Sequence, residues 1–182
     1  MSAAASKKSE IEISKMIRFV AKLEGKSNTI RGQLFELVAG HIVHKSFGGN
    51  TYIGKKIRDE NGDRAEIDVL SIEGNKAIRI IECKGNNSNN IIDLPTINLW
   101  ELKIRIIRNW IEENTEYKHR EQHFEYWTTG GFDPEASAYL DKIKASTKKF
   151  TIDYKAFPAL IELASSQKLT SICDLLREHY SP

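Results

Sequence analysis

Residues 65–85 carry the sequence AEIDVLSIEGNKAIRIIECKG, which contains two apolar runs on either side of Glu73-Gly74-Asn75. A Gly-Asn pair between two β-rich runs is typical of a β-hairpin, so we expect strands over residues 65–72 and 76–84. Both runs carry apolar residues at adjacent as well as alternating positions. This pattern predicts that the two strands lie centrally in a sheet that is covered on both faces.

Among the charged side chains of these strands, Asp68 in the first and Glu82 and Lys84 in the second form a candidate cluster. Side chains of a strand alternate between its faces, so Glu82 and Lys84 point the same way. The turn lies nearly midway between Asp68 and Glu82, which predicts carboxylates that are almost opposite each other. Charged groups inside apolar strands are costly without partners, so the cluster favours a functional site over solvated residues at the strand ends.

Two adjacent carboxylates are a good binding site for Mg²⁺ or Mn²⁺, because hard cations prefer oxygen ligands and offset the repulsion of the pair. We expect Asp68 and Glu82 as metal ligands, with the backbone carbonyl of Cys83 as a third. A metal lowers the pKa of its bound water, and the Lys84 ammonium can stabilise charge that develops on a phosphate. The sequence therefore predicts phosphodiester hydrolysis by Asp68, Glu82 and Lys84, which Glu36 could join from a preceding helix.

The remaining chain alternates helical and strand patterns around this hairpin. Apolar spacing predicts helices over residues 10–23, over a segment that begins at Thr29, and over residues 96–113, where Leu99, Leu102, Ile106 and Trp110 are in register. Further strands are expected at residues 51–58, 124–128 and 150–154, a helix after Asp133-Pro134, and two short helices in residues 157–180. This order is typical of an α/β domain with a mixed central sheet flanked by helices.

The composition fits a single domain with small additions. The chain has 182 residues, of which 40% are apolar and 29% charged, and its net charge is +2. Its two cysteines, Cys83 and Cys173, form no CxxC pair, and no apolar run approaches the roughly 20 residues that span a bilayer. We therefore expect a soluble, cytoplasmic protein with no membrane partner.

Basic residues gather on two of the predicted elements. Lys55, Lys56, Arg58 and Arg64 lie on or beside the strand at residues 51–58, and Lys103, Arg105 and Arg108 on the long helix. They could line a path for backbone phosphates of a nucleic acid, or form an ordinary solvated face, since the net charge is near zero. Gly130-Gly131 has no phosphate-loop context, so no nucleotide cofactor is expected.

A family resemblance enters at these residues. Residues 65–85, together with RGQLFELVAGHIV at 31–43, resemble the PD-(D/E)xK restriction-endonuclease-like superfamily. FEYWTTGGFDPEASAYLDKIKAS at 124–146 resembles the strand, turn and helix that follow in Mrr-like type IV restriction endonucleases.

The resemblance implies a restriction-endonuclease-like core and a Mg²⁺-dependent DNA endonuclease. By position, Asp68 and Glu82 match the metal ligands, Lys84 the catalytic lysine and Glu36 the acidic residue of the preceding helix. Ile67 replaces the proline that names the motif, and an Asn-rich insertion precedes the next helix. We further expect an N-terminal helix in residues 1–27, a nuclease core in 28–155, and C-terminal helices of 156–182 on the same domain.

The leading hypothesis is a metal-dependent endonuclease that acts on DNA, in restriction or defence or in repair. A homodimer or a partner protein could supply target recognition, because no DNA-reading module is visible. Two alternatives remain: a catalytically silent nucleic-acid-binding or assembly module with the nuclease fold, and a nuclease that acts on RNA or branched DNA.

Overall fold

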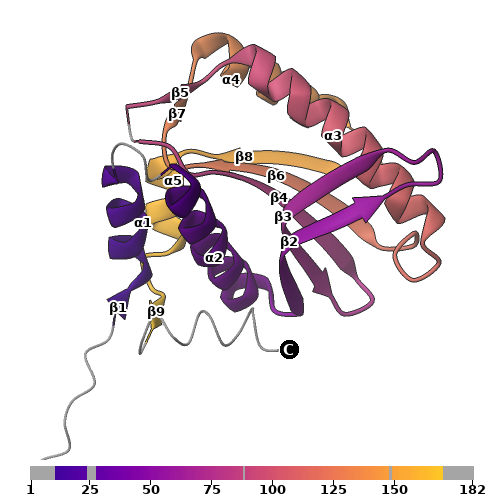
Figure 1. The fold of residues 1–182 in the computed structure, drawn as a ribbon, viewed down its shortest axis with the longest axis horizontal. Helices are drawn as coiled ribbons and strands as arrows, with labels where there is room; N and C mark the ends of the chain where they lie inside the picture. Colours follow the sequence, from indigo (N-terminus) through magenta and orange to yellow (C-terminus); the bar gives the residue numbers. More distant parts are fainter. Residues whose placement is uncertain (1–10, 24–27, 88, 148, 170–182) are drawn as a thin grey trace, which may run out of the picture.

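A computed structural model describes residues 11–23, 28–87, 89–147 and 149–169. Its centre is a five-stranded sheet with strand order β2-β3-β4-β6-β8 (Figure 1). The strands are β2 (Asn50–Arg58), β3 (Arg64–Glu73), β4 (Ala77–Lys84), β6 (Glu121–Thr128) and β8 (Thr151–Lys155). The first three form an antiparallel meander, whereas β4, β6 and β8 run parallel. The sheet is therefore mixed, as the sequence predicted.

Helices cover both faces of this sheet. They are α1 (Ile13–Lys22), α2 (Asn28–Phe47), α3 (Leu94–Glu113), α4 (Pro134–Ser146) and α5 (Phe157–Leu163). Figure 1 shows α3 and α4 on one side of the sheet and α1, α2 and α5 on the other. Helices α3 and α4 are the crossovers that parallel strands require between β4, β6 and β8. This arrangement confirms the predicted α/β class with a mixed sheet flanked by helices.

The predicted hairpin between β3 and β4 is confirmed. Its register pairs Val69 with Ile81 and Leu70 with Ile80. The turn places Gly74 at φ +57, a left-handed conformation that a residue with a side chain rarely adopts. The Gly-Asn sequence therefore fixes the register that determines which side chains of β3 and β4 are neighbours.

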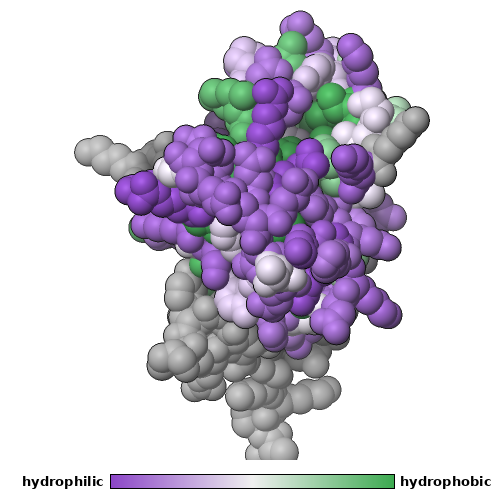
Figure 2. All heavy atoms as spheres, turned by 90° about the vertical axis from the view of Figure 1, so that its right-hand side faces the viewer, coloured by the Kyte–Doolittle hydropathy of each residue, from purple (hydrophilic) through white to green (hydrophobic). Residues whose placement is uncertain are grey.

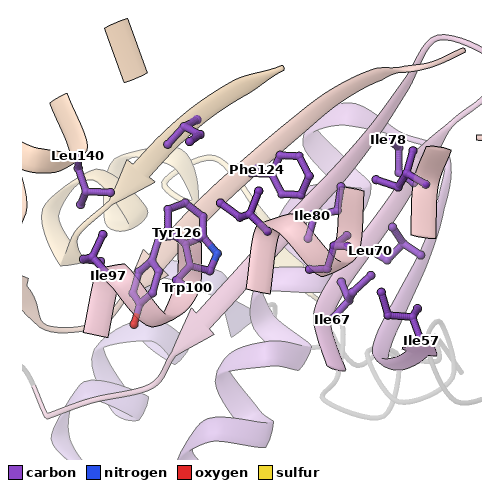
Figure 3. Close-up of a cluster of buried hydrophobic side chains, with 14 of the residues drawn as sticks. Ile57, Ile67, Leu70, Ile78, Ile80, Ile97, Trp100, Phe124, Tyr126 and Leu140 are labelled. Atoms are coloured by element: carbon purple, nitrogen blue, oxygen red, sulfur yellow. The ribbon is translucent and has the colours of Figure 1, made fainter. Parts of the chain in front are cut away.

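Two hydrophobic clusters, one on each face of the sheet, form the core. On the first face, α1, α2 and α5 pack against Val69, Ile81 and Trp127. On the second, α3 and α4 pack against Leu70 and Ile80 with their neighbours (Figure 3). This division follows from strand alternation, and each large side chain buried here contributes roughly 1.5–3 kcal/mol.

The predicted buried face of the long helix was wrong. Leu99 is 68% exposed and Leu102 51% exposed, although both belong to the predicted stripe. The buried set is Ile97, Trp100, Ile104, Ile107 and Ile111. Both sets have helical spacing and each includes one tryptophan, but the buried one continues through five residues, so it removes more apolar area from water.

The ends of the chain also differ from the prediction. Two short strands, β1 (Ile11–Glu12) and β9 (Lys168–Leu169), pair antiparallel, so α1 starts after β1, and β9 follows α5. A second short pair, β5 (Ile91–Ile92) and β7 (Gly131–Phe132), is parallel and was not predicted. Most of the second C-terminal helix expected before residue 180 lies outside the described residues. No helix in the described ranges has the length and apolar composition to cross a bilayer.

Candidate active site

The pairing of β3 with β4 ends at a point where two carboxylates are the next residues in register. Val69 pairs with Ile81, and one step further lie Asp68 and Glu82. From here to Arg64, β3 keeps only β2 as a partner. Asp68 Oδ2 accepts a hydrogen bond of 2.7 Å from the backbone N–H of Cys83. The Asp68 carboxylate thus takes the place of the backbone carbonyl that a paired strand would offer to this N–H.

A lysine that the sequence analysis assigned to phosphate binding lies between these carboxylates. Lys103 Nζ is 2.5 Å from Glu82 Oε2 and 3.4 Å from Asp68 Oδ1. Trp100, Ile104 and Ile107 anchor α3 on the sheet, and the same face of the helix carries the ammonium toward the carboxylates. The cluster is partly buried, with 15% of the Asp68 side chain and 22% of Glu82 and Lys103 exposed.

One ammonium does not balance the negative charge of this cluster. Burial raises the pKa of Asp68, although Lys103 counteracts it. Burial and then the charge of Asp68 raise the pKa of Glu82. Burial alone would lower the pKa of Lys103, but Glu82 and Asp68 outweigh it, and the net shift is upward. Burial thus outweighs the effect of Lys103 at both carboxyl groups, and a further cation would stabilise their ionised forms.

Glu36 of α2 extends the acidic cluster. Burial and then the negative charges of Asp68, Glu66 and Glu82 raise its pKa to about 7. Gly85 explains how α2 comes so near: a Cβ there would lie 2.9 Å from the carbonyl oxygen of Arg31. The structure thus brings Glu36 into the electrostatic neighbourhood of the pair.

Lys84 ends β4 as an exposed side chain. Its charge lowers the pKa of Glu82, which places the ammonium near the cluster. It lines two hollows, one of about 300 Å³ with Glu36 and Cys83, and one of about 580 Å³ with Asn86 and its neighbours. The Cys83 side chain lies in the hydrophobic core, and burial raises the pKa of its thiol. The thiol is therefore not available to a metal, and the backbone carbonyl of Cys83 stays the predicted ligand.

The basic residues of β2 and β3 lie mainly on the surface of the protein. Lys56, Arg58 and Arg64 are exposed. Lys56 and Arg64 line a hollow of about 250 Å³ together with Glu66, and the half-buried Lys55 lies over the Tyr52 ring. Figure 2 views the end of the molecule that carries the β2–β3 turn, and this face is mostly hydrophilic.

The two arginines predicted on α3 are already paired. Arg105 forms an ion pair of 3.6 Å with Glu101, and Arg108 one of 3.1 Å with Glu112. The Arg108 guanidinium also stacks over the Phe150 ring at 4.4 Å. Arg108 is mostly buried by its contacts, whereas Arg105 stays largely exposed, and its weak surface ion pair leaves it available to a phosphate.

Sequence reasoning missed Glu66 and the pairing of Lys103. Glu66 lies two residues before Asp68 on the same strand, so the period of two could have placed it on the same face. Nothing in the sequence pairs Lys103 with residues 35 and 21 positions away.

The side-chain ligands available to a metal are therefore few. Within the residues that the structure describes, no group of three or more His, Cys, Asp or Glu side chains could hold a metal ion. Asp68 and Glu82 form a pair, so further ligands would be backbone carbonyl oxygen and water, which Mg²⁺ commonly retains.

No family model matches the chain, and no curated protein does. Among solved structures, the chain is similar to a protein of unknown function, AF1548, with a TM-score of 0.49 and 16% identity over 67% of this chain and 56% of that one. A repair endonuclease from Pyrococcus abyssi has a TM-score of 0.36 and 13% identity over 74% and 47%. EndoMS in complex with double-stranded DNA has a TM-score of 0.36 and 11% identity over 65% and 42%. The chain thus spans about half the length of these proteins.

Proposed function

We propose that this protein is a metal-dependent nuclease that hydrolyses phosphodiester bonds of DNA, with Mg²⁺ or Mn²⁺ bound by Asp68 and Glu82. The observation that carries the proposal is the position of the Lys103 ammonium, 2.5 Å from one carboxylate and 3.4 Å from the other. A cation already lies between two carboxyl groups whose pKa values are raised, chiefly by burial, so a further positive charge would stabilise their ionised forms. The donor set therefore fits a divalent cation, which the ammonium stands in for.

Each residue around that cation has a separate role in the proposed reaction. A bound divalent metal would supply Lewis acidity and lower the pKa of a coordinated water. Asp68 and Glu82 hold the cation, and the hydrogen bond from Cys83 N–H orients Asp68. Lys84, exposed at the end of β4, can meet the phosphate and stabilise the charge that develops on its oxygens. Glu36, with a pKa of about 7, can accept or release a proton near neutral pH.

Nucleic acid would approach along exposed basic residues. Lys56, Arg58 and Arg64 are exposed on the strands that lead to Asp68, where they can bind backbone phosphates without reading sequence. A DNA substrate is part of the proposal; two of the similar structures are named as a repair endonuclease and as a complex of EndoMS with double-stranded DNA. A role in restriction, defence or repair, with a homodimer or partner protein for target choice, is part of the same proposal.

The test is cleavage of a substrate panel under three metal conditions. The purified protein would be incubated with supercoiled, linear, single-stranded and branched DNA, and with RNA, in Mg²⁺, Mn²⁺ or EDTA. We expect cleavage of DNA with either metal and none in EDTA. Equal cleavage in EDTA would overturn the metal mechanism, and cleavage of RNA alone would overturn the DNA assignment.

A second candidate is a catalytically silent nucleic-acid-binding module. The observation that favours it is the same ammonium, because Lys103 partly neutralises Asp68 and Glu82 without a metal. Complete inactivity on the whole panel, combined with salt-dependent binding of DNA, would select this function instead.

A further inference from the structure

A hollow beside Lys84 has features that the proposed cleavage chemistry does not use. It has a volume of about 580 Å³, within the range of roughly 300 to 1,000 Å³ that is typical of small-molecule sites. It lies between the loop that follows β4 and the first turn of α3, and its walls combine amides with the apolar side chains of Ile91 and Ile92. Ile91 is 63% exposed, although it is a large apolar residue.

Three asparagine side chains give this hollow its hydrogen-bonding capacity. Asn86, Asn89 and Asn90 line it, and none of their side chains makes a hydrogen bond to any residue that the structure describes. Asn87 differs, because its side chain accepts the Asn89 N–H at 3.1 Å within the loop. Each free amide offers two donors and one acceptor oxygen.

The backbone of Asn86 and of Asn90 is fixed to the body of the protein, so the positions from which these two side chains project are held in place. Thr129 Oγ1 accepts the Asn86 N–H at 2.8 Å and donates to the Asn86 carbonyl at 2.5 Å. Gly131 N–H donates to the Asn90 carbonyl at 3.0 Å. A Cβ on Gly130 would lie 2.2 Å from that carbonyl oxygen, so only glycine permits this approach.

We propose that this hollow, lined by Asn86, Asn89, Asn90 and Ile91, binds the base of an unpaired nucleotide next to the bond that is cut. An amide that offers a donor beside an acceptor matches the edge of a nucleobase, and an exposed isoleucine can cover its face. Lys84 lines the same hollow, so a base bound there would be within one nucleotide of the phosphate that Lys84 meets. A base stacked in an intact duplex cannot enter a hollow, so the substrate would carry an unpaired base at this position.

This inference rests on the proposed function and narrows its substrate to DNA with a bulge, flap, loop or single strand. The experiment measures the affinity of the whole chain, in EDTA to prevent cleavage, for three fluorescent DNA probes. One probe is a perfect duplex, the second is the same duplex with a single bulged nucleotide, and the third is single-stranded. The double variant Asn89→Ala/Asn90→Ala is compared with the wild type, and Asn98→Ala is the matched control, because Asn98 is exposed on α3 outside the hollow.

We expect the wild type and Asn98→Ala to bind the bulged and single-stranded probes about tenfold more tightly than the duplex. The double variant should lose this preference while its duplex affinity and salt dependence stay unchanged, since no charge is removed. A double variant that keeps the preference, or a wild type that shows none, overturns the base site while cleavage in Mg²⁺ leaves the proposed function standing. A wild type that neither binds nor cleaves any nucleic acid overturns both.

Discussion

Two clusters of buried charge lie on neighbouring strands of this sheet. They differ in how many positive partners each buried carboxylate has. In one, Asp68 and Glu82 share the single ammonium of Lys103. In the other, the 3% exposed Glu125 forms ion pairs with both Arg79 and Lys155.

In the second cluster, both carboxylate oxygens of Glu125 have partners within the protein. Trp127 Nε1 donates to Glu125 Oε2 at 2.8 Å, and Lys155 Nζ lies 2.5 Å from the same oxygen. Burial would raise the pKa of Glu125, but Lys155, Trp127 and Arg79 outweigh burial and lower it. Arg79 also pairs with Glu73, and Lys155 with Asp153.

The comparison separates a structural cluster from a binding cluster. Glu125 has two positive partners and a lowered pKa, so a further cation would stabilise it less. Asp68 and Glu82 retain raised pKa values beside Lys103, so a divalent cation would stabilise them further. The balance of charge, more than burial itself, distinguishes the two sites.

The largest expected effect is on cleavage. Glu82→Gln and Lys84→Ala should each lower turnover by roughly 10²-fold or more, because each removes a charge that acts on the reacting groups. Glu125→Gln should keep the turnover of its folded fraction, since it lies in the structural cluster. Initial cleavage rates in Mg²⁺, corrected for the folded fraction by circular dichroism, measure the turnover of each variant. A fully active Lys84→Ala protein would remove Lys84 from the mechanism.

The second effect is on stability, where the variant of Glu125 should lose more than the variant of Asp68. Glu125→Gln should lower the free energy of unfolding by about 1.5–3 kcal/mol, because Arg79 and Lys155 lose a buried charged partner but keep Glu73 and Asp153. Asp68→Asn should be neutral or stabilising without metal, because it removes one of two repelling carboxylates. Urea unfolding of both variants at neutral pH measures the difference. If Asp68→Asn proved the more damaging, the acidic pair would be the structural cluster.

The third effect concerns Lys103 as a competitor of the metal. Lys103→Met should bind Mn²⁺ about tenfold more tightly or better, because losing one positive charge in this site changes the electrostatic free energy by at least about 1.4 kcal/mol. Arg105→Gln is the control, since Arg105 lies on the same helix but is paired with Glu101. Calorimetric titration measures both affinities. Weaker binding by Lys103→Met would mean that the ammonium assists the metal.

The smallest effect is a dependence of stability on pH. The pKa of Glu36 rises from 4.5 to about 7 on folding, so the folded protein binds its proton more tightly than the unfolded chain does. Stability from this group is present below pH 4.5 and is lost as pH rises toward 7. Glu36→Gln should therefore melt higher than the wild type at alkaline pH and lose that advantage in acid. A pH-independent difference in melting temperature would assign the effect to packing.

Glu125 should show the opposite pH dependence. Its pKa is lowered on folding, so the stability it contributes is present at neutral pH and is lost as pH falls through the acidic range. The two clusters thus predict opposite slopes, and Glu36→Gln and Glu125→Gln melted over the same pH series compare them within one fold.

The hairpin and its pair of carboxylates were predictable because both depend on local rules. Gly74-Asn75 sets the register, and strand alternation then places Asp68 beside Glu82. The buried face of α3 was not predictable, because two apolar stripes of similar spacing compete and only packing on the sheet decides between them. The pairing of Lys103 depends on that rotation of α3. Likewise, the Glu125 cluster joins three strands, and no local pattern connects Arg79 with Lys155.

The most direct test of the central claim is stabilisation by metal. Melting temperatures of the wild type, Glu82→Gln and Glu125→Gln would be measured with and without Mn²⁺, since a ligand that binds only the folded state raises stability. We predict that Mn²⁺ raises the melting temperature of the wild type and of Glu125→Gln, and leaves that of Glu82→Gln unchanged. An equal rise in Glu82→Gln, or no rise in the wild type, would contradict the assignment of Asp68 and Glu82 as the metal site.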